Sequence, residues 1–483
     1  MLYLLLALLA IAAVVYLIYK KVHAAAAIFC VGVALLMFSA LLGRADLRTT
    51  EIDATGNSFY DQLLVIEELF KSRFSGIGMA IMVLFGFVSY MRHIGADAKT
   101  VVALSTPLRR FKGSYWLVPL GFLIGNLLSL VIPSASALSL LLVATLLPAL
   151  IAAGLTPLTV GAIVVTSSTI VPTPLEAGLI QGAALSEMSV TEFVYGSVAR
   201  STIPALLITA FVHMWWQRRC DIVDARTAAH APSAGAEGVG HDSADDEMPT
   251  DRTDDAHIQE AIRRAANLPF YYALLPLMPL VLIVVSAILN RAGVLPFEAG
   301  ILPVTVVSLV IALIIESARH RNVPEAIDAA ASFFKGMGEG AGGVVALLVA
   351  AAVFVEGITQ MGVIDMLISA AEGSSGASVL IVLVFVLATA AMATLTGSGT
   401  APYFAFAEVV PAFAKDTSIH APQMLTAIWG TSNSMRQISP VNAAVLIVSG
   451  AINASPMKLV KRTSVPMIAA TVLNVIFSFM FIA

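Results

Sequence analysis

The sequence contains little charge and almost no cysteine. Only 12% of its 483 residues are Asp, Glu, Lys or Arg, whereas soluble domains contain about 25%. Its two cysteines, Cys30 and Cys220, are too few for a disulfide framework. Segments with the polar–apolar alternation of a membrane β-barrel do not occur. The composition therefore excludes a soluble globular domain, a disulfide-rich secreted domain and an outer-membrane barrel.

The sequence also lacks the motifs of metalloproteases and ATP-driven pumps. It has no HExxH pattern and no P-loop. His213 is the one histidine inside an apolar run, and Ser398 has no evident catalytic base. These absences argue against an intramembrane enzyme. We expect no enzymatic activity, no metal and no cofactor.

Long apolar runs fill the sequence instead, since 58% of the residues are hydrophobic. A run of about 20 residues crosses a hydrocarbon layer of about 30 Å. We therefore predict an all-α polytopic membrane protein. Its ten expected spans are 2–19, 24–42, 75–91, 157–186, 201–217, 269–290, 298–317, 337–354, 424–452 and 463–482.

Two further apolar regions, 115–152 and 378–412, are interrupted at 133–136 and 396–402. We interpret each as a re-entrant hairpin of two half-length helices. Two full spans in either region would leave the topology unchanged, because the chain returns to the side it left.

The two halves of the chain repeat weakly. Phe70-Lys71 resembles Phe334-Lys335, and Thr166-Ser167 resembles Thr431-Ser432, at nearly constant separation. The predicted first repeat is 1–217, the linker 218–268, and the second repeat 269–483. Each repeat has five crossings and one hairpin. Because five is odd, the repeats have opposite orientations, as in many secondary transporters.

Orientation follows from the basic residues, which concentrate on the cytoplasmic side. Their distribution places both termini in the periplasm and the loop 218–268 in the cytoplasm, and it leaves Arg436 at membrane depth. The loop is rich in Ala, Asp, Glu, Gly and Ser, which favours a solvated, disordered linker. His241 and His257 leave metal binding as the alternative.

Four interruptions of apolar helices supply the candidate binding residues. Broken helices expose backbone N–H and C=O groups, which membrane proteins tolerate around a protein-lined cavity. Isolated hydroxyls in a span usually bond to the preceding turn, but four clusters at repeated positions favour a binding site. The candidates are Ser134, Ala135 and Ser136; Thr166, Ser167, Ser168, Thr169, Pro172 and Thr173; Thr396, Gly397, Ser398, Gly399 and Thr400; and Thr431, Ser432, Asn433, Ser434 and Arg436.

Arg436 is the most informative of these candidates. An unpaired arginine in mid-membrane is costly, and its planar guanidinium suits bidentate contact with a carboxylate. We predict that it binds an anionic substrate. The alternatives are a permanent pair with Glu176 or Glu408, or extension to the interface. The same two carboxylates are candidates for coupling transport to protons.

The sequence resembles the DcuC family of bacterial anaerobic four-carbon dicarboxylate carriers over nearly its whole length. The resemblance is clearest in FGFVSYMRHIGA, LLVATLLPAL, ALLVAAAVFVEGI, TGSGTAPYFAFAEVVP and VKRTSVP. It implies transport of fumarate, succinate or malate across the inner membrane by exchange or ion-coupled symport. The wider ion transporter superfamily further implies a homodimer in which a transport domain slides against a scaffold. By position, the hairpin tips and the two hydroxyl-rich breaks would line the site.

One departure concerns the coupling ion. Sodium-coupled relatives in this superfamily have Ser-Asn-Thr at the hairpin tips, whereas this chain has SASA and GSGT. Proton coupling, sodium coupling and exchange therefore stay open. The identity of the substrate also stays open, since citrate, an amino acid or an acyl-amino acid would also need a cation in the site. A channel is less favoured, because two inverted halves around one site suit alternating access.

Overall fold

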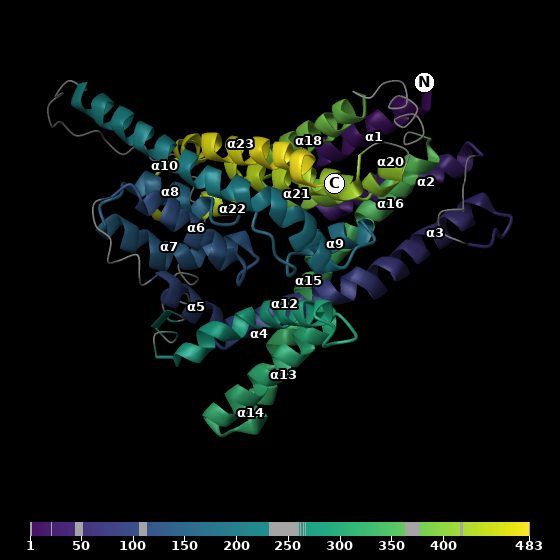
Figure 1. Cartoon of the computed structure of the whole chain (residues 1–483). Helices are drawn as coiled ribbons and strands as arrows, with labels where there is room; N and C mark the ends of the chain where they lie inside the picture. The colour runs from purple at the N-terminus through teal and green to yellow at the C-terminus, as the bar shows by residue number, and fades with distance from the viewer. Residues whose placement is uncertain are drawn as a thin grey trace.

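The structure is a computed structural model that describes residues 2–20, 22–43, 52–105, 114–230, 267–362, 377–415 and 419–482, with Glu260, Ile262, Arg263 and Ala265. Every regular element within these ranges is a helix (Figure 1). Nine segments in them are long and apolar enough to cross a membrane. The prediction of a polytopic helical membrane protein is confirmed.

One group of helices combines elements from both halves of the chain. α4 packs along α15, α2 along α16, and α13 against α4 and α12. The bounds in the first half are α1 Leu2–Tyr19, α2 Ala24–Leu41, α3 Ser58–Arg73, η1 Phe74–Gly78, α4 Met79–His93 and α5 Ala96–Ser105. Those in the second half are η4 Phe270–Leu277, α12 Met278–Arg291, α13 Ile301–His320, α14 Val323–Ala329, α15 Ala331–Gly340, η5 Ala341–Val345 and α16 Ala346–Gln360. We call this set the outer group; α13 and α14 project from it in Figure 1.

The remaining helices form an inner group, in which α10 packs on α23, α21 on α23, and α7 on α22. Its first-half members are α6 Leu117–Ser129, α7 Ala135–Ala152, α8 Pro157–Val165, α9 Ala177–Leu185, η3 Glu192–Val198 and α10 Ala199–His230. Its second-half members are α18 Ala377–Thr396, α19 Thr400–Ala407, α20 Val410–Lys415, α21 Ala421–Met435, η6 Arg436–Ile438, α22 Ala443–Ala451 and α23 Pro456–Phe481. Both hairpins and both broken helices lie in this group.

Small residues bring the outer helices α4 and α15 very close together. A Cβ on Gly336 would lie 2.4 Å from Ser89 Cβ, and one on Gly86 would lie 2.7 Å from the Phe333 carbonyl oxygen. Such contacts are typical of membrane helices, whose association depends on close backbone approach. The pair α4–α15 therefore forms a fixed wall, and this wall faces the inner group at the site described below.

The predicted breaks are present, but the hairpins are less symmetrical than expected. The regions 157–186 and 424–452 divide into α8 and α9, and into α21 and α22, as the sequence indicated. The expectation of two half-length helices in each hairpin is wrong for one arm. α7 has 18 residues and α18 has 20, enough to cross a membrane, whereas α6 has 13 and α19 has 8. Each hairpin thus combines a long arm with a short one.

The helix α10 extends past the predicted end of the first repeat at residue 217 and continues to His230. Residues 218–230, assigned to the disordered linker from composition, are therefore helical. Charged side chains in this extension bind elsewhere in the protein: Asp221 and Asp224 both pair with Arg462 of α23. His241 and His257 lie outside the described residues, whereas Glu260, Ile262, Arg263 and Ala265 near the end of the predicted linker are described and helical.

Candidate substrate-binding site

A cavity of about 420 Å³ lies where both hairpin tips meet the second broken helix. The tips contribute Pro133 to Ser136 and Gly397 to Thr400, and the broken helix contributes Arg436 and Asn442 to Ala444. The outer helices α4 and α15 close the other side with Leu84, Phe85, Val88, Ser89, Arg92 and Glu339. Its volume falls in the usual range for ligand sites, about 300–1,000 Å³. The tips that sequence reasoning singled out therefore lie together.

Local capping explains how the hairpin tips are held. Ser134 accepts a hydrogen bond from the Ala137 backbone N–H at 3.4 Å and so caps α7. At the other tip, Gly397 has a φ of +68°, which glycine adopts readily. Its carbonyl accepts a hydrogen bond of 2.7 Å from Asn442, which also caps α22. The second tip is thereby attached to the second broken helix.

The guanidinium of Arg436 is only partly satisfied. Its Nη2 donates to the carbonyl and hydroxyl oxygens of Ser168, at 3.1 and 3.2 Å. Its Nε is buried without a hydrogen-bond partner. Within the described ranges, Arg436 forms no ion pair with a carboxylate. A partly buried arginine with unused donors can bind an anion.

Gly399 makes room for this arginine. A Cβ at Gly399 would lie 2.8 Å from Arg436 Cδ and 3.0 Å from Asn433 Oδ1. The Gly399 carbonyl also accepts a short hydrogen bond from Ser432. Ser432 and Asn433 therefore support the tip from behind, although neither lines the cavity.

The first broken helix lies behind Arg436 rather than at the cavity wall. Thr166, Ser167 and Thr169 are buried, and each hydroxyl donates to a backbone carbonyl of the preceding turn. Asn126 of α6 completes this break: it donates to the Thr166 carbonyl and accepts from the Thr169 N–H, both at 3.1 Å. Only Ser168 reaches Arg436. The break is thus satisfied largely by protein groups.

Five other predicted site residues also lie outside the lining of the cavity. Thr396 and Thr431 bond back to their own helices, at 2.8 Å each. Thr173 accepts from the Leu175 N–H at 3.3 Å. Pro172 is partly exposed, and the Ser434 hydroxyl is buried without a partner.

Neither predicted coupling carboxylate lines the cavity. Glu176 caps α9 through the Leu179 N–H at 2.8 Å and accepts from Trp429 Nε1 at 2.9 Å. Glu408 forms an ion pair of 2.7 Å with Arg73 of the outer group and accepts from Gln181 at 2.8 Å. The sequence left open a permanent ion pair between Arg436 and one of these two carboxylates. In the structure, each carboxylate instead binds the partners just named.

Sequence reasoning missed the polar residues on the outer wall, Ser89, Arg92 and Glu339. Arg92 is one of the basic residues that the charge distribution assigns to the cytoplasmic side. A signal did exist: Phe85, Ser89 and Arg92 recur at positions i, i+4 and i+7 and therefore share one helix face. No sequence pattern, however, indicates that this face meets the two hairpin tips.

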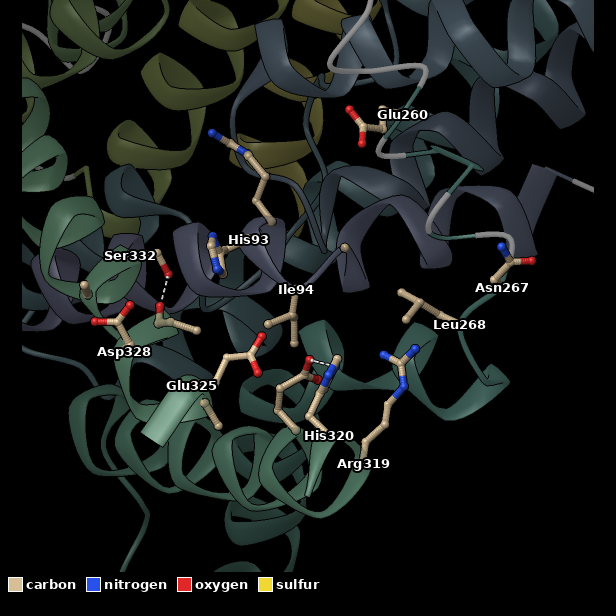
Figure 2. Close-up of a pocket in the computed structure, with 16 residues that line it drawn as sticks. His93, Ile94, Glu260, Asn267, Leu268, Arg319, His320, Glu325, Asp328 and Ser332 are labelled. Carbon is tan, nitrogen blue, oxygen red and sulfur yellow. Dashed lines mark hydrogen bonds and ion pairs between the residues drawn. The ribbon is translucent and has the colours of Figure 1, made fainter. Parts of the chain in front are cut away.

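A second, larger cavity of about 820 Å³ lies beside the first and shares Arg92 with it. Figure 2 shows its lining, with His93 at the end of α4 facing Arg319, His320, Glu325 and Asp328 from α13 and α14. Glu316 binds His320 at 2.9 Å. Four carboxylates line this larger cavity, those of Glu260, Glu316, Glu325 and Asp328, against two arginines. This excess of acidic groups does not suit an anion site, and we call the cavity the vestibule.

Comparisons with known proteins agree on one family. The family model described as DcuC, C4-dicarboxylate anaerobic carrier, matches residues 2–483. The anaerobic C4-dicarboxylate transporter DcuC of Escherichia coli K12 is 31% identical over 95% of this chain and 92% of its own. A probable DcuC transporter of Vibrio cholerae is 30% identical over 99% of this chain and 97% of its own.

A solved structure supports the fold. The YdaH transporter of Alcanivorax borkumensis is 16% identical, with a TM-score of 0.56 over 93% of this chain and 97% of its own. At that identity the likeness concerns the fold alone. The family names indicate a multi-pass membrane transporter and not an enzyme. By the match of the family model and the near-complete alignment with its curated members, this chain belongs to the DcuC family of C4-dicarboxylate anaerobic carriers.

Proposed function

We propose that this protein is a secondary active transporter of four-carbon dicarboxylates, such as fumarate, succinate and malate, across the bacterial inner membrane. The names of its relatives support the substrate class. The observation that carries the proposal is Arg436, which lines a cavity between two hairpin tips and forms no ion pair in the described part of the chain. A substrate carboxylate would complete its hydrogen bonds.

The remaining contacts in this proposal come from neutral groups. Ser134, Ser136, Ser398 and Thr400 line the same cavity and offer hydroxyls. Hydroxyls and freed backbone N–H groups can hold an anion without trapping it, which suits a carrier that must release its substrate. Thr166, Ser167, Thr169, Thr431 and Asn433 are predicted to support the site from behind.

We further propose that the two halves are inverted repeats and that transport follows an elevator-type mechanism in a homodimer. The outer and inner groups each draw helices from both halves in matching order, which supports this division into scaffold and transport domain. Both termini would lie in the periplasm and the vestibule would open to the cytoplasm.

The coupling ion is proposed to be a proton or sodium, unless the protein works by exchange alone. Glu176 and Glu408 stay candidates for the proton because both are carboxylates in the inner group. Glu176→Gln and Glu408→Gln would each separate exchange from proton-driven uptake. If both variants keep the full pH dependence of uptake, neither carboxylate is the coupling group.

The proposed function is tested with purified protein in liposomes. We expect saturable uptake and counterflow of labelled succinate, and counterflow would exclude a channel. Arg436→Gln should abolish succinate uptake while the protein still elutes as a folded species in gel filtration. Competition by fumarate, malate, citrate, amino acids and acyl-amino acids then identifies the preferred carboxylate. Uptake by Arg436→Gln at the wild-type rate would contradict the assignment.

A further inference from the structure

The outer wall of the cavity holds a second guanidinium that the proposed function does not use. Arg92 lies in the last turn of α4 and lines the cavity together with Arg436, which belongs to the inner group. It forms no ion pair or hydrogen bond within the described ranges. The close α4–α15 packing fixes the position of this turn relative to α15, which carries Glu339 on the same wall. The cavity therefore has a cation on each of its two sides.

Arg92 also lines the larger vestibule and so stands where the two cavities meet. An anion that enters from the vestibule would meet Arg92 before Arg436. A cation at this position would therefore contact an entering anion first. An arginine in the last turn of a helix also interacts favourably with the helix dipole, which needs no such role.

Glu339 is the one acidic side chain among the residues that line the smaller cavity. It lies on α15, which packs along α4. Its charge opposes that of Arg92 on the same wall when the site is empty. A substrate with two carboxylates would contact both guanidinium groups, those of Arg92 and Arg436. A substrate with one carboxylate would leave one guanidinium without a partner.

We propose, resting on the proposed function, that Arg92 binds the second carboxylate of the substrate and thereby sets the preference for dicarboxylates. Arg436 holds the first carboxylate from the inner group, and Arg92 holds the other from the outer group. Glu339 weakens anion binding by like-charge repulsion and so helps release. The substrate thus spans the boundary between the two helix groups.

The test compares succinate with succinamate, its half-amide, which has the same length but one carboxylate. Binding of both to purified protein is measured for wild type, Arg92→Gln, Arg92→Lys and Arg436→Gln. Arg92→Gln should weaken succinate binding by about tenfold or more, while succinamate changes by less than about twofold. Arg92→Lys should recover part of the succinate preference, and Arg436→Gln should weaken both ligands.

Two further variants sharpen the result. Glu339→Gln should tighten succinate binding severalfold, because a negative charge leaves the site. Lys335→Gln removes an exposed cation from the same helix that lines neither cavity, and it should leave both affinities unchanged. Gel filtration and thermal unfolding of each variant confirm that it is folded.

The outcomes separate this inference from the proposed function. If wild type binds no dicarboxylate, the proposed function fails and this inference fails with it. If wild type prefers succinate but Arg92→Gln leaves that preference intact, or weakens both ligands equally, only the role of Arg92 is overturned.

Discussion

At the residue scale, a polar cluster around Arg462 shares no residue with the lining of the cavity. Arg462 is 3% exposed and forms ion pairs with Asp221 at 2.7 Å and Asp224 at 2.5 Å. Asp221 also accepts hydrogen bonds from Tyr115 and Thr159, each at 2.9 Å. Three helices, α8, α10 and α23, meet through these side chains. The cluster is structural, and charge balance there does not depend on a substrate.

We expect Arg462→Gln to destabilise the protein strongly. Removing Arg462 leaves the buried carboxylate of Asp221 uncompensated, which costs about 3–5 kcal/mol. The carboxylate of Asp224 is half exposed and adds little. Thermal unfolding in detergent should show a large fall in midpoint. The matched control is Lys461→Gln. Lys461 is adjacent and exposed, and its contact with Trp216 is made by its backbone carbonyl, which the substitution keeps. Equal effects of the two substitutions would contradict a special role for Arg462.

A second residue-scale prediction concerns Asp97 on α5, outside the membrane-spanning segments. Burial raises the pKa of this carboxyl to about 6, although its own hydrogen bond from Ala98 and the charge of Arg92 oppose the change. Because the folded pKa exceeds the unfolded value, Asp97 favours folding most at low pH. That contribution is lost as pH rises through about 6.

Asp97→Asn should remove this dependence. Between pH 4 and pH 7, wild type should lose roughly 2–3 kcal/mol of stability relative to the variant. Unfolding midpoints of both proteins, measured across that range, provide the check. If the unfolding midpoints of the two proteins change in parallel with pH, the titration of Asp97 does not contribute to stability.

At the element scale, the second hairpin tip depends on Gly399 being small. We expect Gly399→Val to abolish dicarboxylate uptake with little loss of folded protein, because its side chain would collide with Arg436 and narrow the cavity. Gly450→Ala on α22 serves as a control, since a Cβ there meets nothing within 4 Å. Transport by Gly399→Val comparable to that of the control would show that the tip tolerates a larger side chain.

The helix interruptions were predictable because their causes are local. Proline, glycine and clustered hydroxyls mark residues 166–178, 396–402 and 431–442, and the structure breaks its helices there. The unequal hairpin arms were not predictable, because the packing partners of α7 and α18 decide how far those helices continue. Composition likewise suggested a disordered linker from residue 218, whereas Asp221 and Asp224 extend α10 by pairing with Arg462.

At the scale of the whole molecule, the sequence identified half of the cavity. Arg436 and both tips were recognisable because charge and helix breaks are unusual in a membrane. Arg92 and Glu339 were not, because an arginine or glutamate near a helix end is ordinary there. Their relevance depends on how the outer group stands against the inner one, and this is a property of the three-dimensional arrangement alone.

The ion pairs of Asp221 and Asp224 with Arg462 are noncovalent contacts between the first half of the chain and the second. Polypeptide continuity between the halves should therefore be dispensable. Two co-expressed fragments, 1–240 and 241–483, should assemble and transport dicarboxylate, and a tag on either should recover both. Recovery of the tagged fragment alone would contradict this expectation. If the fragments assemble, an ancestor of this protein could have consisted of two separately encoded chains that associated to form the carrier.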